Sequence, residues 1–208
     1  IKMKLFTNGI GLRKLLPEFI EILMKVEYLR LSLDSARRST LSEIKKVKEE
    51  EFDNILKSIK TLRCASDKSK KGKTKIEIGF VITKKNLKDI NLAAKVVKDA
   101  GAHSILYRMD FLDPTIYYRE KNYIDEQLLK ARSIADDDFN VLIDYDSPEL
   151  LCRRCYYPYF FLTIGADGKL YPCGHRALAG SQSFGSALSE ESLSSLIVNQ
   201  RKDKRICK

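Results

Sequence analysis

The stretch "KIEIGFVITKKNLKDINLAAKVVKDAGAHSILYR", Lys75 to Arg108, decides the fold. Its β-branched beginning, 75–83, predicts a buried strand. Residues 86–101 have the apolar spacing of an amphipathic helix, and Gly101 stands where such a helix ends. Residues 103–108 predict a second strand. A strand, a helix and a strand of these lengths form one unit of a parallel sheet that is covered by helices.

The same alternation extends in both directions from this unit. On the amino-terminal side, 3–9 and 28–35 predict strands, whereas 11–25 and 39–62 predict helices, the latter either as one helix or in two pieces. Ser39, with Ser42 and Glu43, offers a capped start to the second helix. On the carboxyl side, 117–135 predict a helix and 139–144 predict a strand. The chain is therefore expected to be an α/β protein with a parallel sheet.

The carboxyl ends of the expected strands carry small polar residues. Right-handed crossovers place all of these ends at one edge of the sheet, where ligands of such folds bind. We expect a polar ligand at this edge, near Thr7, Asn8, Ser32, Asp34, Ser35, Thr83, Asn86, Arg108 and Asp110.

Composition favours a water-soluble globular protein. The 208 residues are 44% hydrophobic and 32% charged, with no apolar run of membrane-spanning length and no signal peptide, so we expect a cytoplasmic location. The net charge of +10 raises the possibility of nucleic-acid binding. The densest basic run, 67–75, lacks interleaved aromatic residues, however, and reads as a solvated loop. Nucleic acid is therefore not the expected partner.

The carboxyl-terminal segment, 148–208, has a different character. Its central stretch "CRRCYYPYFFLTIGADGKLYPCGH", 152–175, holds three of the five cysteines around a predicted β-hairpin. A helix is expected over 189–204, followed by Cys207. An odd number of cysteines without a secretory context disfavours a disulfide framework and favours a metal.

Spacing alone leaves the metal open. A zinc ion could be held by Cys152, Cys155 and Cys173, with either Cys207 or His175 as the fourth ligand. A 4Fe–4S cluster could be held by Cys152, Cys155, Cys173 and Cys207. Cys64 lies apart from these and is expected to be an ordinary, partly buried side chain.

The cysteine segment resembles the auxiliary-cluster extension of radical S-adenosylmethionine enzymes, called SPASM or, when shorter, twitch. Cys155, twelve residues, Gly168, four residues and Cys173 are similar to its Cys-Gly-Cys pattern. "LFTNG" at 5–9, "RLSLDS" at 30–35 and the unit at 78–108 resemble the third to sixth strands of the family's partial (βα)-barrel. The resemblance implies a partial radical SAM barrel over 1–147 and an auxiliary cluster domain over 148–208.

Site residues follow from this resemblance. In the family, the strand with "SLD" presents polar groups to S-adenosylmethionine, which implies Ser32 and Asp34 here, with Thr7 and Asn8 at the same edge. Many relatives place an Arg in the following helix; the matching position here is Lys45 or Lys46, and a lysine lacks the bidentate fork of an arginine. The auxiliary 4Fe–4S cluster is expected on Cys152, Cys155, Cys173 and Cys207.

The implied activity is that of a radical enzyme. Such enzymes cleave S-adenosylmethionine to a 5′-deoxyadenosyl radical, which removes a hydrogen atom from a small-molecule or peptide substrate, and an electron donor such as flavodoxin or ferredoxin serves them. The family's Cys-x3-Cys-x2-Cys loop is absent from these 208 residues. We therefore expect a fragment of a longer enzyme that is inactive by itself.

Several assignments stay open at this stage. Tyr107, Arg108 and Asp110 could face a substrate or could be packing and surface residues, and His103 is expected at the surface. The alternative function is a zinc-stabilised binding module, for nucleic acid or protein, on an α/β scaffold.

Overall fold

The computed structural model describes residues 4–14, 17–69, 74–110, 113, 115–144, 163–165, 167–171, 173, 183–186, 195 and 198. The chain divides into two compact units, 1–147 and 148–208. The two domains expected from the sequence share this boundary, and their roles stay predictions. Each unit is described by itself below.

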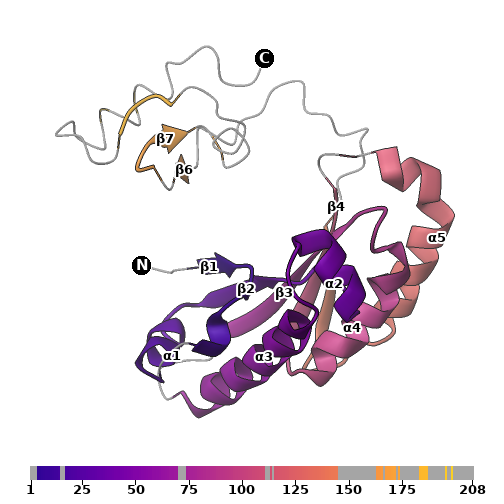
Figure 1. Cartoon of the computed structure of the whole chain (residues 1–208), viewed down its shortest axis with the longest axis horizontal. Helices are drawn as coiled ribbons and strands as arrows, with labels where there is room; N and C mark the ends of the chain where they lie inside the picture. The colour runs from indigo at the N-terminus through magenta and orange to yellow at the C-terminus, as the bar shows by residue number, and fades with distance from the viewer. Residues whose placement is uncertain are drawn as a thin grey trace. The chain divides into compact units, whose positions relative to one another are not determined.

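Unit 1 contains a five-stranded parallel sheet (Figure 1). Neighbouring strands follow chain order, β1-β2-β3-β4-β5. This confirms the α/β class and the parallel sheet that alternating strands and helices predict. The strands are β1 (Lys4–Thr7), β2 (Tyr28–Ser32), β3 (Lys75–Ile82), β4 (Ser104–Met109) and β5 (Asn140–Ile143).

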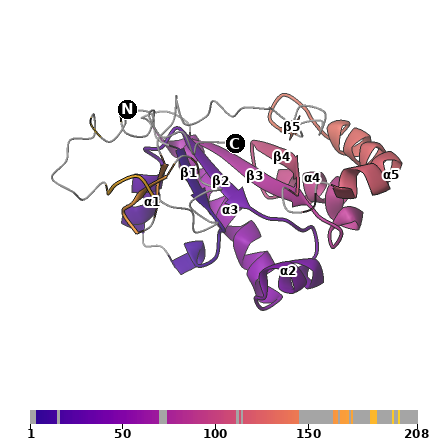
Figure 2. The same ribbon diagram turned by 90° about the horizontal axis from the view of Figure 1, so that it is seen from above.

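Helices connect successive strands and lie along one face of the sheet (Figure 2). A sequential strand order with right-handed crossovers requires this one-sided arrangement. The expected helical region 39–62 forms two helices, as considered from the sequence. The helices are η1 (Leu12–Lys14), α1 (Pro17–Leu23), α2 (Arg38–Lys45), α3 (Glu50–Lys68), η2 (Leu87–Asp89), α4 (Ile90–Asp99) and α5 (Thr115–Arg132).

The core lies between the sheet and these helices. Leu29 and Leu31 of β2 and Ile78 of β3 are completely buried against Ile55 and Ile59 of α3. Alternation along each strand sends the intervening side chains to the opposite face. None of those side chains belongs to the core that the described helices cover, so we call this side the helix-free face. It carries Tyr28, Arg30, Ser32, Glu77, Gly79, Ser104, Leu106, Arg108 and Leu142.

The ends of two helices test the capping expectations. Gly101 follows α4 with φ +92, and its N–H donates to the carbonyl of Lys98 at 2.8 Å, so the expected glycine stop is confirmed. The prediction that Ser39 caps the second helix is wrong. The residue that precedes α2 is Arg37, which is extended and makes no side-chain cap. Ser39 therefore lies inside the first turn, where its hydroxyl is not the capping group.

Unit 2 contains the predicted hairpin. β6 (Thr163–Ile164) and β7 (Leu170–Tyr171) pair antiparallel. Gly168 has φ +73 in the turn between them, and Tyr171 Oη donates to Asp167 Oδ2 at 2.8 Å. The helix expected over 189–204 falls almost wholly outside the described residues. Within the described part of the chain, no helix is long and apolar enough to cross a membrane.

Candidate functional site

Ser32 ends β2 on the helix-free face, at the carboxyl edge of the sheet. It is paired in register with Gly79 of β3. Gly79 has no Cβ, and the Arg30 side chain lies over it, with Arg30 Cδ 3.2 Å from the position that a Cβ would take. Among the described residues, Ser32 Oγ has no hydrogen-bond partner. This hydroxyl is therefore available to a ligand.

Asp34, two residues further on, joins β2 to β3. Its Oδ1 accepts a hydrogen bond from the Val81 N–H at 2.9 Å. Asn86 Nδ2 donates to the Asp34 carbonyl at 2.9 Å and to the Val81 carbonyl at 2.8 Å. Asp34 and Asn86 thus hold the two strand ends together, which gives one carboxylate oxygen of Asp34 a structural role.

Lys45 of α2 reaches the same strand end. Its Nζ donates to the Ser32 carbonyl at 2.7 Å and lies 3.4 Å from Asp34 Oδ2. The Lys45 side chain is largely buried there, whereas Lys46 is exposed with φ 55 just beyond the helix. Of the two lysines at this position, Lys45 is the one that carries positive charge to the site.

Thr7 and Asn8 form the turn after β1. Thr7 Oγ1 accepts a hydrogen bond from the Gly9 N–H at 3.2 Å, and Asn8 Oδ1 accepts one from the Ile10 N–H at 3.0 Å. Local bonds of this kind are what Thr and Asn make in turns. Their acceptor oxygens serve the turn, and ligand contact by either residue stays a prediction.

The loop after Asp34 is anchored by an aspartate that sequence reasoning missed. Asp89 is buried; its Oδ2 accepts from the Ala36 N–H at 2.8 Å, and its Oδ1 lies 2.7 Å from Arg37 Nη1. Ser35 is fully buried beside it, and its hydroxyl has no partner among the described residues. The position of Asp89 at the start of α4 is a sequence signal that could have marked it as an anchor.

The open assignments around β4 are resolved by alternation along this strand. Tyr107 is completely buried on the helix side, where its Oη donates to the Ile90 carbonyl at 2.7 Å and its ring centroid lies 5.3 Å from that of Phe80. Burial raises the pKa of Tyr107 above its usual range. Tyr107 is a packing residue. Arg108 lies on the helix-free face, half exposed, and its Nη2 contacts Asp144 Oδ2 at 2.7 Å.

His103 and Asp110 flank β4. His103 Nδ1 accepts a hydrogen bond from the Ile76 N–H at 3.1 Å, so this histidine ties β4 to β3 and is not simply a surface residue. The Asp110 N–H donates to the Ile82 carbonyl at 3.1 Å, which extends the pairing of β3 and β4 by one bond.

An ionic cluster on the helix-free face was missed by sequence reasoning. Arg30 Nε lies 2.5 Å from Glu77 Oε1, Arg30 Nη2 donates to Tyr28 Oη at 2.9 Å, and Ser104 Oγ lies 3.3 Å from Glu77 Oε2. Burial raises the pKa of Glu77. Burial and the nearby charge of Arg108 lower the pKa of Arg30. The sequence signal for this cluster was the presence of charged residues, such as Arg30 and Glu77, at alternate positions of strands that are otherwise apolar.

Of the cysteines that are expected to hold a metal, only Cys173 lies among the described residues. Cys173 follows β7 with a free, partly buried thiol. Cys152, Cys155, Cys207 and His175 lie outside the described residues, so the ligand set and the metal stay predictions. Cys64 is exposed on α3, which corrects the expectation of a partly buried side chain. Leu62 and Ser66, on either side of it, are the residues that face the core.

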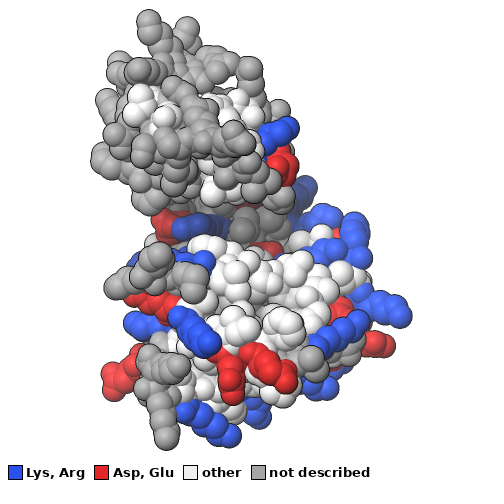
Figure 3. Space-filling model, turned by 90° about the vertical axis from the view of Figure 1, so that its left-hand side faces the viewer, with Lys and Arg blue, Asp and Glu red and all other residues white. Residues whose placement is uncertain are grey.

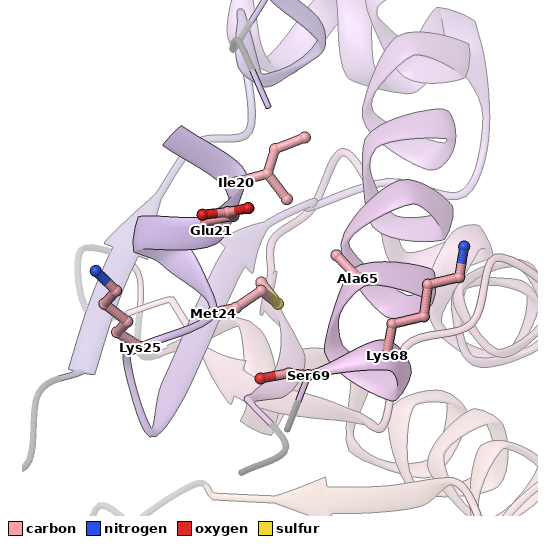
Figure 4. Close-up of a pocket in the computed structure, with 7 residues that line it drawn as sticks. All are labelled: Ile20, Glu21, Met24, Lys25, Ala65, Lys68 and Ser69. Atoms are coloured by element: carbon pink, nitrogen blue, oxygen red, sulfur yellow. The ribbon is translucent and has the colours of Figure 1, made fainter. Parts of the chain in front are cut away.

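A cavity of about 350 Å³ lies elsewhere, between α1 and α3 (Figure 4). Met24 and Ser69, which line it, stand just before β2 and β3 along the chain. The cavity is therefore near the amino ends of these strands, opposite the edge that carries Ser32. Its position does not suit the ligand expected at the carboxyl edge. Its other lining residues are Ile20, Glu21, Lys25, Ala65 and Lys68.

Surface charge gives no sign of a basic stripe on the face in view (Figure 3). There, Lys and Arg side chains alternate with Asp and Glu around an area of uncharged residues. Mixed signs of this kind differ from the clustered basic patch typical of nucleic-acid binding.

Comparison with known proteins gives one consistent likeness. No family profile and no curated protein matches the sequence. The structure of SuiB from Streptococcus suis matches 98% of the chain with a TM-score of 0.62 and 14% identity. SuiB bound to S-adenosylmethionine matches 95% with a TM-score of 0.63 and 16% identity. SuiB bound to its precursor peptide SuiA matches 95% with a TM-score of 0.61 and 18% identity.

The likeness shows a shared fold. The chain spans about half the length of SuiB, 50% of it in the first match and 47% in the other two. The fold is α/β, with five parallel strands and helices on one face, consistent with a partial radical SAM barrel.

Proposed function

We propose that the protein acts as a radical S-adenosylmethionine enzyme, to which these 208 residues contribute barrel strands and an auxiliary cluster domain. The observation that carries the proposal is the fold shared with SuiB, one of whose structures contains S-adenosylmethionine. When bound, S-adenosylmethionine and a 4Fe–4S cluster supply the radical that abstracts a hydrogen atom from the substrate.

The residues at the edge of β2 suit S-adenosylmethionine. The ligand carries ribose hydroxyls, an amino group and a carboxylate. Ser32 Oγ, which has no partner among the described residues, can bond a hydroxyl or the carboxylate. The Lys45 ammonium, held against the Ser32 carbonyl, adds positive charge near the carboxylate of the ligand. Asp34 Oδ2, which lies 3.4 Å from Lys45 Nζ, can accept a further hydrogen bond from the amino group.

The auxiliary cluster is proposed for unit 2. Cys173 directly follows the hairpin with a free thiol, as a cluster ligand must. Cys152, Cys155 and Cys207 complete the proposed set. This cluster can accept an electron from a product radical or hold a substrate. A peptide is the favoured substrate class because one SuiB structure contains its precursor peptide.

The test is S-adenosylmethionine binding by anaerobically purified protein, measured by isothermal titration calorimetry. Ser32→Ala should weaken binding by roughly threefold to tenfold, which is the loss expected for one net hydrogen bond of about 1 kcal/mol. Ser133→Ala is the matched control, because Ser133 Oγ bonds only to the Lys130 carbonyl within its own helix end. Equal affinities for the wild type and Ser32→Ala would remove Ser32 from the site, and no binding at all would overturn the proposal.

A further inference from the structure

Two buried polar side chains connect the segment between β3 and α4 to the loop that follows β2. Asn86 and Asp89 are each 1% exposed, and the Asp89 N–H donates to the Asn86 carbonyl at 2.8 Å, so both residues belong to one turn. Polar groups that are buried this deeply are costly unless they are hydrogen-bonded. Their partners therefore indicate which part of the molecule they hold in place.

Asn86 holds the two strand ends and orients the Asp34 carboxylate. Its Nδ2 donates to the Asp34 carbonyl at 2.9 Å and to the Val81 carbonyl at 2.8 Å. Its Oδ1 accepts a hydrogen bond from the Thr83 N–H at 2.8 Å. The Val81 N–H in turn donates to Asp34 Oδ1 at 2.9 Å. Since Oδ1 is held to β3 in this way, Oδ2 is the oxygen that Asp34 presents beside Lys45.

Asp89 holds the far end of the same loop. Its Oδ2 accepts a hydrogen bond from the Ala36 N–H at 2.8 Å, and its Oδ1 lies 2.7 Å from Arg37 Nη1. Arg37 is the residue that precedes α2, so Asp89 fixes the place where this helix begins. Lys45 is the last residue of α2, and its Nζ donates to the Ser32 carbonyl at 2.7 Å. The placement of α2 therefore decides where the Lys45 ammonium lies.

We propose that Asn86 and Asp89 are positioning residues for the amino-acid end of S-adenosylmethionine and do not contact the ligand themselves. The inference rests on the proposed function, because it takes Asp34 and Lys45 as the partners of the amino and carboxylate groups of the ligand. The side chains of Asp34 and Lys45 are 17% and 13% exposed, so a ligand can reach them, whereas Asn86 and Asp89 are inaccessible. Asn86 acts through the Asp34 carboxylate, and Asp89 acts through α2 and Lys45.

This role concerns only one half of the ligand. S-adenosylhomocysteine and 5′-methylthioadenosine are both thioethers of adenosine, but only the first carries the amino and carboxylate groups. Loss of a positioning residue should therefore weaken the binding of S-adenosylhomocysteine and spare that of 5′-methylthioadenosine. A general loss of structure at the site would weaken both.

The experiment measures the dissociation constants of these two ligands by isothermal titration calorimetry with anaerobically purified protein. Asn86→Ala should weaken the binding of S-adenosylhomocysteine by roughly fivefold to tenfold, which is the loss expected when about one hydrogen bond to the ligand is misplaced. The dissociation constant of 5′-methylthioadenosine should change by less than about twofold. Equal weakening of the two ligands would overturn the positioning role of Asn86.

Thr74→Val is the matched control. Thr74 is also 1% exposed, and its Oγ1 donates to the Val26 carbonyl at 2.7 Å. It thus joins the segments that precede β2 and β3, at the opposite edge of the sheet from Asn86. This variant should lower the urea concentration at which the protein unfolds and leave both dissociation constants unchanged.

Variants of Asp89 test the proposal without relying on the folding of Asn86→Ala. Asparagine retains a side-chain oxygen that can accept from the Ala36 N–H but lacks the charge that pairs with Arg37. Both Asp89→Ala and Asp89→Asn should weaken S-adenosylhomocysteine selectively, and the asparagine variant should keep more of the affinity. Unchanged affinity in folded Asp89→Ala, or equal weakening of the two ligands, would overturn the role of Asp89.

Failure of this inference is distinguishable from failure of the proposed function. If the wild type does not bind S-adenosylmethionine, the proposed function is refuted and this inference is refuted with it. If the wild type binds S-adenosylmethionine but the variants do not discriminate between the two thioethers, only the positioning roles of Asn86 and Asp89 are refuted.

Discussion

At the scale of single residues, the strand "YLRLS" shows both the predicted alternation, which the structure confirms, and the main omission of the sequence analysis. Its alternation predicts that Ser32 lies on one face, and the structure leaves the Ser32 hydroxyl available at the carboxyl edge. The same alternation places Arg30 on that face. Its partner Glu77, however, depends on the register between β2 and β3, which local sequence does not fix. The charged residues at alternate strand positions could be noticed in the sequence, but for this reason the pairing of Arg30 with Glu77 could not be predicted.

Glu77 predicts an unusual pH dependence. Its pKa is raised above 4.5 by burial, so the folded state binds more protons than the unfolded state between these two values. The contribution of Glu77 to stability should therefore fall as the pH rises from about 4.5 through the folded pKa. In urea unfolding, the free energy of the wild type minus that of Glu77→Gln should decrease across this range.

Asp136 provides the opposite case. A hydrogen bond from Lys98 lowers the pKa of Asp136 below 3.8, so its contribution should be present above about pH 3.8 and be lost as the pH falls through the folded pKa. In urea unfolding, the free energy of the wild type minus that of Asp136→Asn should therefore increase with pH. Parallel trends in the two variants would contradict the assignment of burial as the dominant influence on Glu77.

At the scale of elements, the order of strands and helices followed from sequence because each element has a clear period. The residues 75–83 are apolar and β-branched, and 86–101 repeat every third or fourth position. The residues at which helices begin were harder to predict. A Ser with a nearby Glu is a common helix start, yet α2 begins at Arg38, because Asp89 binds the Ala36 N–H and the Arg37 side chain and fixes the chain there.

Ser39 gives the direct test of this correction. It is exposed in the first turn of α2 and makes no cap, so Ser39→Ala should change the free energy of unfolding by less than about 0.5 kcal/mol, or raise it slightly through helix propensity. Loss of a true cap costs about 1 kcal/mol. A loss of that size, measured in urea, would show that Ser39 caps the helix after all.

At the scale of the whole molecule, the sequence changes character near residue 147, where the chain also divides into two compact units, and the identities of the two expected domains stay predictions. The sequence could not determine which metal the cysteines bind. A metal site depends on how distant thiols converge, and spacing along the chain does not determine convergence. Cys173 is placed after the hairpin, and its partners Cys152, Cys155 and Cys207 remain predictions.

The central proposal is that this chain is part of a radical S-adenosylmethionine enzyme with an auxiliary cluster, and metal content tests this proposal most directly. Protein purified without oxygen should contain about four iron and about four sulfide per chain. Cys173→Ser should lose most of both, whereas Cys64→Ser, at an exposed cysteine of α3, should keep them. About one zinc per chain with neither iron nor sulfide would contradict the claim and would indicate a structural zinc site instead.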